Sequence, residues 1–298
     1  MRVAITGSSG LIGSALKAEL TARGHDPIAI VRGDPAPGEI PWDPATGTLE
    51  SGRLVGVDAV VNLAGPSIAD HRWTSSYKRE LRDARIAATR LVAETIARTT
   101  GGPRVLVSAS GVNYYGESDT ATFDETSPAG DGFLAQLCVD WEASTAAASD
   151  AGVRVATIRT GLVLSADGGA LAKMRPLFRL GLGGRFGSGR QWQSWIAIDD
   201  HVAAMIHLLE GAASGPVNLV APIPVTNREF TATLGRVLGR PAVIPIPKFG
   251  PALVFGRELV DTLLFRGQRV LPAALVADGF EFRFRTLEPA LRAILGRP

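Results

Sequence analysis

Short apolar runs alternate with longer stretches of helical spacing through the first half of the chain. The apolar runs are nearly continuous and lie at 3–6, 27–32, 58–65, 104–110 and 154–164. Helical patterns follow the first run up to about Arg23, cover 75–99, and begin again near 130. Near-continuous apolar strands separated by helices predict an α/β fold with a doubly wound, Rossmann-like parallel sheet covered on both faces. Such folds bind ligands at the carboxyl ends of their strands.

The pattern changes after about Leu164. Glycine is frequent in 181–195, and 243–256 is typical of short strands and turns around a helix. We therefore expect a dinucleotide-binding domain over 1–164 and a smaller C-terminal α/β substrate lobe over most of 165–298. The apolar segments between about 195 and 222 are expected to return to the main sheet, so the two parts are interleaved.

Composition excludes several classes of protein. The net charge of +2 is close to balance and no basic run is present, which argues against a nucleic-acid partner. No segment approaches the roughly 20 apolar residues that a membrane span needs, and glycines and serines at 7–10 interrupt the N-terminal apolar run, unlike a signal peptide. The single cysteine, Cys138, excludes an internal disulfide and fits a reducing compartment, so we expect a cytoplasmic protein.

A glycine-rich turn follows the first predicted strand. Gly7, Gly10 and Gly13 stand at three-residue intervals in "TGSSGLIG", where they permit a tight turn, close approach of a pyrophosphate, and close packing of helix on strand. The start of the following helix offers free N–H groups and partial positive charge to phosphates. This pattern favours a dinucleotide site over a plain strand–turn–helix, and its binding residues are Gly7, Ser9, Gly10, Leu11, Ile12 and Gly13.

The end of the second strand indicates which dinucleotide binds. An acid near this position contacts the ribose 2′-hydroxyl of NAD, whereas an arginine accommodates the 2′-phosphate of NADP. Arg32 ends the strand and favours NADP(H). In the alternative interpretation, Arg32 is a solvated strand end and Asp34 contacts the ribose.

Four motifs together resemble one family. The glycine spacing, "NLAG" at 62–65, "SASGVNYYG" at 108–116 and "DETSP" at 124–128 are similar to the extended short-chain dehydrogenases/reductases, which include nucleotide-sugar epimerases and dehydratases. Residues 159–200 resemble more narrowly an epimerase-like subfamily whose names refer to sugar epimerases or cell-division inhibitors. The resemblance covers most of the chain.

The resemblance implies positions around the cofactor. Ala64 and Gly65, with Leu63, are expected beside the adenine ribose. Ser108 and Ser110 are expected beside the nicotinamide, one of them bonded to the substrate oxygen, and Tyr115 in the pocket wall. These three are the predicted catalytic residues. Together with Arg85, which we also assign to cofactor binding, these residues complete the predicted site.

The family's acid/base pair is missing. Relatives carry Tyr and Lys four residues apart on the helix after this segment, and the Lys lowers the pKa of the Tyr so that the phenolate removes a hydroxyl proton. Counting back from Glu142, which resembles the family's Glu beyond the pair, these positions hold Leu134 and Cys138. Three interpretations remain: an oxidoreductase or epimerase with another acid, a non-catalytic NADP(H)-dependent sensor or regulator, or a vestigial site. The intact glycine turn argues against the third.

Replacements for the missing tyrosine are few. Tyr114 and Tyr115 lie at the carboxyl edge of the fifth run, but a phenol with a pKa of about 10 needs a nearby cation to act as a base. Cys138 lies among apolar residues and is expected to be a buried thiol rather than a reactive one. Glu125 can pack its loop as well as catalyse.

The substrate side is rich in arginine and tryptophan. Arg185, Arg190, Trp192 and Trp195 fall in "GRFGSGRQWQSW", and guanidinium and aromatic groups suit anionic or sugar-like ligands. Lys78, Arg82 and Arg85 share one helix face, and Trp42 and Trp73 lie near strand ends. The alternative is a solvated charged face and a hairpin packed by tryptophan.

The remaining expectations concern metals and partners. The four histidines lack metal-like spacing, so no metal site is expected. A homodimer through the long helices is the default assembly. We therefore expect an NADP(H)-binding epimerase- or reductase-like protein acting on an anionic or nucleotide-sugar-like small molecule.

Overall fold

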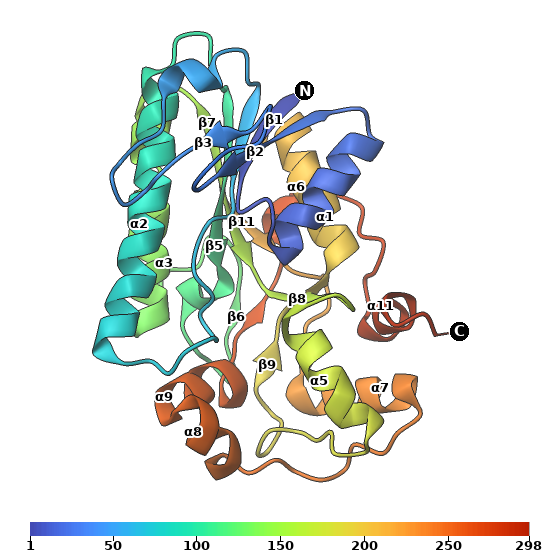
Figure 1. Ribbon diagram of the computed structural model, residues 1–298. Helices are drawn as coiled ribbons and strands as arrows, with labels where there is room; N and C mark the ends of the chain where they lie inside the picture. The colour runs from blue at the N-terminus through green and yellow to red at the C-terminus, as the bar shows by residue number, and fades with distance from the viewer. Residues whose placement is uncertain (298) are drawn as a thin grey trace.

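The computed structural model describes residues 1–297, which form a central seven-stranded sheet and a smaller lobe below it (Figure 1). Every strand pair in the main sheet is parallel, in the order β11-β7-β5-β4-β1-β2-β3. The doubly wound α/β prediction is confirmed. The strands are β1 Arg2–Thr6, β2 Asp26–Val31, β3 Ile40–Pro41, β4 Ala59–Asn62, β5 Val105–Gly111, β7 Arg154–Thr160 and β11 Gly215–Leu219.

Helices cover both faces of this sheet because its strands are apolar on both sides. On one face α1 (Leu11–Ala22) and α6 (Ile198–Glu210) pack through residues such as Leu16 and Met205. On the other, α2 (Ser75–Arg98) and α4 (Ala146–Asp150) pack with residues such as Val92 and Ala148. Figure 1 shows α3 (Phe133–Ala143) beside α2.

The order of the strands places a topological switch at β1. The chain moves outward from β1 to β2 and β3, then returns to the other side of β1 as β4. Loops at the carboxyl ends of β1 and β4 therefore diverge, and such a crevice is where doubly wound sheets bind ligands.

The lower lobe is built from short elements. Two-stranded sheets join β10 to β8, β12 to β9 and β13 to β6. The antiparallel partner of β9 ends at Thr226, whose side chain caps α7 in a capping box with Glu229. The elements of the chain outside the main sheet and its helices, in the lower lobe and elsewhere, are β6 Thr122–Phe123, β8 Leu162–Leu164, α5 Gly169–Arg179, β9 Trp192–Gln193, β10 Trp195–Ala197, β12 Val225–Thr226, α7 Asn227–Leu238, α8 Phe249–Phe255, α9 Arg257–Val260, β13 Arg269–Val270, α10 Ala273–Ala277 and α11 Leu287–Ile294, with 3-10 helices at Ser51–Leu54 and Val112–Tyr115 and a π-helix at Asp261–Phe265. Of these, α10 and the 3-10 helix Ser51–Leu54 pack on the main domain.

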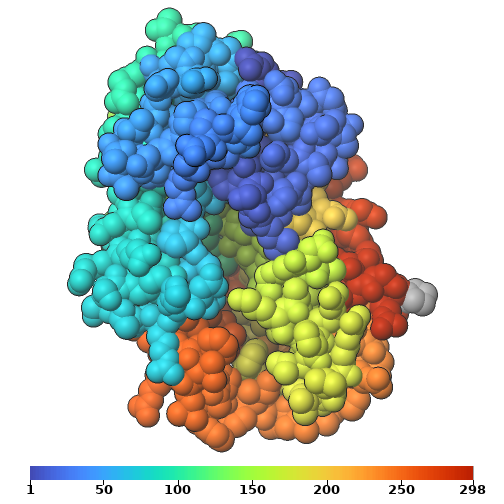
Figure 2. Space-filling view, viewed as in Figure 1, coloured from blue at the N-terminus to red at the C-terminus, as the bar shows by residue number. Residues whose placement is uncertain are grey.

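The segment 243–256 differs from its predicted form. It contains α8 but no named strand, and its only ladder contact is an isolated bridge between Phe186 and Ile246. Residues 215–219, by contrast, form the edge strand β11 of the main sheet. Figure 2 shows a hollow between the blue and cyan N-terminal segments and the yellow-green segment that carries α5. No helix within residues 1–297 is both long and apolar enough to span a bilayer.

Candidate functional site

The glycine-rich turn packs as the sequence predicts. Gly7 has φ +67°, and a Cβ on it would lie 3.0 Å from the carbonyl carbon and oxygen of Leu63. A Cβ on Gly13 would lie 2.2 Å from the Gly7 oxygen, so only glycine lets α1 approach the turn this closely. The first intrahelical acceptor is the Gly10 carbonyl, which bonds the Ser14 amide at 2.9 Å. The amides of Leu11, Ile12 and Gly13 precede that bond and are the free donors of the helix start.

A buried polar network holds the turn against the end of β4. Thr6 Oγ1 donates to Asn62 Oδ1 at 2.8 Å and accepts from the Leu63 and Ala64 amides at 3.1 and 3.2 Å. Asn62 Nδ2 in turn donates to Thr89 Oγ1 and to Ser108 Oγ. Ser108 is 1% exposed. The hydroxyl of Ser108 therefore belongs to the network that connects β1, β4 and β5 beneath the predicted cofactor edge.

Arg32 follows β2 directly and is exposed, as is Asp34. Among residues 1–297, Arg32 forms no ion pair with a carboxylate. Because β2 is the neighbour of β1, the guanidinium lies on the same edge as the glycine turn.

Arg85 of α2 points inward beneath the β4–α2 loop. Its Nη1 donates to the Leu81 carbonyl at 3.0 Å and its Nη2 to the Pro66 carbonyl at 2.7 Å. The guanidinium lies 5.1 Å from the centre of the Trp141 ring, and its Nε is buried without a partner. Burial lowers the pKa of Arg85, but an arginine remains charged at neutral pH.

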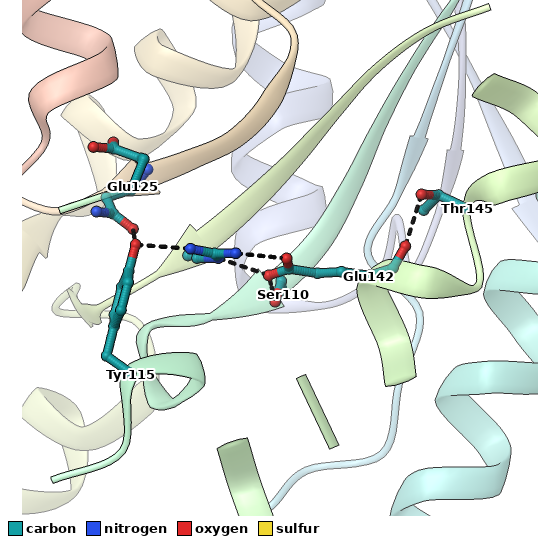
Figure 3. A network of polar contacts seen from close by, with 7 residues as sticks. Ser110, Tyr115, Glu125, Glu142 and Thr145 are labelled. Carbon is teal, nitrogen blue, oxygen red and sulfur yellow. Dashed lines mark hydrogen bonds and ion pairs between the residues drawn. The ribbon is translucent and has the colours of Figure 1, made fainter. Parts of the chain in front are cut away.

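A second buried network lies at the carboxyl ends of β5 and β7 (Figure 3). Arg159 makes a two-point ion pair with Glu142, with Nε–Oε1 and Nη2–Oε2 both 2.8 Å. Ser110 Oγ donates to Glu142 Oε1 at 2.7 Å, and Arg159 Nη1 donates to the Tyr115 hydroxyl at 2.9 Å. The Tyr114 ring covers the guanidinium at 3.4 Å.

Tyr115 and Glu125 connect this network to β11. The Tyr115 hydroxyl donates to Asn218 Oδ1 at 2.7 Å, and Glu125 Oε1 accepts the Asn218 amide at 2.9 Å. Burial raises the pKa of Tyr115 to about 12, although the nearby Arg159 acts in the opposite direction. A phenol that is protonated at neutral pH and bonded on both sides is not a general base in this arrangement. Its predicted catalytic role, like those of Ser108 and Ser110, stays a prediction.

The positions of the missing acid/base pair are buried. Leu134 and Cys138 are 6% and 3% exposed on the inner side of α3. Burial is the main reason that the pKa of the Cys138 thiol rises to about 11, with the Glu142 carboxylate adding to the shift. Leu134 has no titratable group and the Cys138 thiol keeps its proton at neutral pH, so neither residue can act as the general base.

Several residues predicted for the substrate side lie elsewhere. Trp42 and Trp195 are 5% and 0% exposed and belong to the core. Lys78 pairs with Glu258 and Arg82 with Asp140, each at 2.8 Å. Helical spacing put Lys78, Arg82 and Arg85 on one face, but only Arg85 turns into the protein, so the three do not form one anion site.

Three other groups remain near the lower lobe. Trp192 is half-buried and lies under the Arg269 guanidinium, 4.8 Å from the ring centre. Arg185 is half-buried with its Nε unpartnered, and Arg190 is exposed. Trp73 donates its ring N–H to the Ile68 carbonyl. Within residues 1–297, no group of three His, Cys, Asp or Glu side chains could hold a metal ion.

A hollow of about 940 Å³ lies beside α1, between the starts of α5 and α6. It reaches the glycine turn only through Ser9 and Leu11, and neither Arg32, Arg85 nor Ser110 lines it. The strand ends rather than this hollow carry the features that suit a dinucleotide.

Sequence reasoning did not identify Asn62, Asn218 or Arg159 as members of this site. One signal for Arg159 was present, since this arginine lies inside the apolar run "RVATIRTGLVL" rather than at its start, where Arg154 stands. A charge inside a central strand needs a buried partner, and Glu142 supplies it.

The parallel sheet, the switch at β1 and the glycine turn define a dinucleotide-binding α/β protein of the extended short-chain dehydrogenase/reductase type. Comparison with known sequences makes this specific: the chain belongs to the NAD dependent epimerase/dehydratase family, whose sequence model matches residues 3–221. Residues 246–294 match a domain of unknown function, DUF1731.

Similar proteins come from bacteria and animals. An epimerase family protein of Mycobacterium tuberculosis is 48% identical over 298 residues, covering 99% of this chain and 98% of its own. The crystal structure of human epimerase family protein SDR39U1 with NADPH superposes with a TM-score of 0.92 at 40% identity, covering 99% of each chain. The crystal structure of a nucleoside-diphosphate sugar epimerase from Corynebacterium glutamicum superposes with a TM-score of 0.83 at 39% identity, covering 99% of this chain and 58% of the other.

Proposed function

We propose that this protein binds NADP(H) across the carboxyl ends of β1, β2 and β4 and uses it in an epimerase- or reductase-type reaction. The observation that carries the proposal is the turn at Gly7–Gly13, packed so tightly that a Cβ at Gly13 would lie 2.2 Å from the Gly7 oxygen. This packing presents the amides of Leu11, Ile12 and Gly13 to a diphosphate. The NADPH in the human relative's structure supports the same choice of dinucleotide.

Arg32 is the residue that selects the phosphorylated form. It is exposed at the end of β2, on the edge of the glycine turn, and forms no ion pair within residues 1–297, although its charge helps to lower the pKa of Asp43. An exposed guanidinium there favours a 2′-phosphate, and Asp34 is the alternative contact for an unphosphorylated ribose. Leu63, Ala64 and Gly65 form the facing wall beside the adenine ribose.

Bound NADP(H) supplies or accepts a hydride at the nicotinamide. The chain's own contribution to that chemistry is Ser110, whose proton is directed at Glu142, leaving the oxygen lone pairs to accept a hydrogen bond from a substrate hydroxyl. The Glu142–Arg159 pair fixes this orientation. We infer an anionic or nucleotide-sugar-like substrate, which the name of the Corynebacterium relative supports.

The alternative is a sensor that binds NADP(H) without turnover. Its supporting observation is that Leu134 and Cys138, at the acid/base positions, are both buried and unable to transfer a proton. Calorimetry with NADPH and NADH tests binding, and the absorbance of bound NADPH during incubation with nucleotide-sugars and a carbonyl panel tests turnover. Consumption of NADPH supports the enzyme, tight binding without consumption supports the sensor, and binding of neither dinucleotide contradicts both.

A further inference from the structure

Arg85 carries a buried positive charge that the described chain does not balance. The residue is 6% exposed, and no carboxylate of residues 1–297 lies within ion-pair distance of it. Its partners are the carbonyls of Leu81 and Pro66, and its Nε has none. Burying an ion without a counter-ion costs several kcal/mol, and such groups are normally paired. The counter-ion of Arg85 is therefore missing from the described chain, and a bound ligand can supply it.

The position of the guanidinium indicates where that anion lies. A Cβ on Gly65 would lie 3.3 Å from Arg85 Cγ and 3.4 Å from its Nε, so the side chain packs directly behind this glycine. Gly65 follows Leu63 and Ala64, whose backbone packs against Gly7 of the glycine-rich turn. The unbalanced cation thus packs against the β4–α2 wall of the proposed cofactor site, and the same wall adjoins the glycine-rich turn before α1.

We propose that Arg85 is a second cation of the cofactor site, and that the anion it balances is the diphosphate of NADP(H). This inference rests on the proposed function. The start of α1 offers partial positive charge on one side of the crevice and Arg85 offers a full charge on the other, which suits a doubly charged group held between them. Arg32 has a different task, because it acts on the 2′-phosphate at the adenosine end.

One consequence is that cofactor-free protein carries an electrostatic penalty that the cofactor removes. Replacing an unbalanced buried ion by an apolar side chain of similar shape is often neutral or stabilising. Methionine has such a shape and packs well beside the Trp141 ring. Without cofactor, Arg85→Met should therefore melt at or above the melting temperature of the wild type. NADPH should raise the melting temperature of the variant far less than that of the wild type.

The deciding experiment compares two ligands. Adenosine 2′-monophosphate reaches the Arg32 end but has no diphosphate, whereas NADPH has both. Arg85→Met should bind NADPH about 30-fold more weakly or worse, as expected for loss of one partner of a buried charged contact, with the affinity for adenosine 2′-monophosphate unchanged. Arg85→Lys should keep most of the affinity for NADPH. The control is Arg90→Met, which removes an exposed arginine from the same helix and should change neither affinity.

Two results overturn the inference. Unchanged NADPH affinity in Arg85→Met would show that the charge is not used. Equal losses for both ligands, with a lower melting temperature of the cofactor-free variant, would show that Arg85 only anchors the Pro66 loop. If wild-type protein binds neither NADPH nor NADH, the proposed function itself fails, which the wild-type titration reveals before any variant is examined.

Discussion

Arg159 and Glu142 form a buried two-point ion pair that joins the central strand β7 to helix α3. Their side chains are 4% and 15% exposed, and the two contacts are both 2.8 Å. Ser110 donates to the same carboxylate from β5. The pair and Ser110 therefore connect three elements at the carboxyl edge of the sheet, close to Leu134 and Cys138, the positions at which the family resemblance implies an acid/base pair.

Loss of the Glu142 charge should destabilise the fold strongly. Glu142→Gln leaves the Arg159 guanidinium buried without a counter-ion, and breaking a buried pair in this way costs about 3–5 kcal/mol. Urea unfolding followed by circular dichroism measures the change in free energy. Asp140→Asn is the control, because Asp140 of the same helix pairs with the half-exposed Arg82 and should change stability by no more than about 1 kcal/mol. Similar losses in the two variants would contradict the importance of burial.

Removal of the Arg32 side chain should lower the affinity for NADPH but not the affinity for NADH. Arg32→Ala deletes the guanidinium proposed to contact the 2′-phosphate, so NADPH affinity should fall about tenfold or more while NADH affinity hardly changes. Calorimetric titration with each dinucleotide measures both constants. Equal losses would refute the contact with the phosphate, and a loss confined to NADH in Asp34→Ala would assign the ribose to Asp34 instead.

Much of the fold follows from residue pattern because apolar strands report burial directly. The runs at 3–6, 27–32 and 104–110 appear as β1, β2 and β5 within a residue or two, since each is too apolar to lie anywhere but inside a two-sided sheet. The glycine-rich turn could be predicted equally well. A side chain at any of its three glycines would meet only the turn itself or the Leu63–Ala64 backbone, so the steric need for glycine depends on the local chain and one neighbouring loop.

The site was less predictable because burial of polar groups depends on partners distant in sequence. Helical spacing placed Lys78, Arg82 and Arg85 on one face, but only contacts with α3 and the Pro66 loop show that Arg85 turns inward. Trp195 looked like a ligand-stacking ring, yet it is fully buried and bonds the Ile223 carbonyl. The network around Arg159 needs residues from four separate elements, and no local pattern brings them together.

A methyl group on Gly13 should remove the cofactor site without touching any proposed contact side chain. The new Cβ would lie 2.2 Å from the Gly7 oxygen, so α1 must move away from the turn and take its free amides with it. Gly13→Ala should weaken NADPH binding at least 100-fold, more than 2.7 kcal/mol. Gly52→Ala is the control, since nothing lies within 4 Å of a Cβ at that position. If a folded Gly13→Ala protein kept its affinity for NADPH, the proposed binding of the diphosphate at the Gly7–Gly13 turn would be wrong.

His201 should make the protein sensitive to mild acid. It is fully buried on α6, its Nε2 lies 3.1 Å from Thr160 Oγ1, and its Nδ1 has no partner. Burial lowers the pKa of His201 to about 3, whereas an unfolded histidine titrates near 6.5. Between these values the unfolded chain binds a proton that the folded chain does not, so stability falls as pH decreases from about 6.5 toward 3.

Each pH unit in that window should remove up to about 1.4 kcal/mol through His201. Asp200 acts in the opposite direction, because burial raises its pKa and its protonation favours the folded state. The comparison therefore has to be made against His201→Gln, which keeps a polar side chain but cannot titrate. Urea unfolding at several pH values from 7 to 4 gives the free energy of unfolding as a function of pH. The slope of this plot should be smaller in His201→Gln than in wild type, by an amount that corresponds to about one bound proton. Parallel profiles for wild type and His201→Gln would mean that His201 takes up its proton without unfolding.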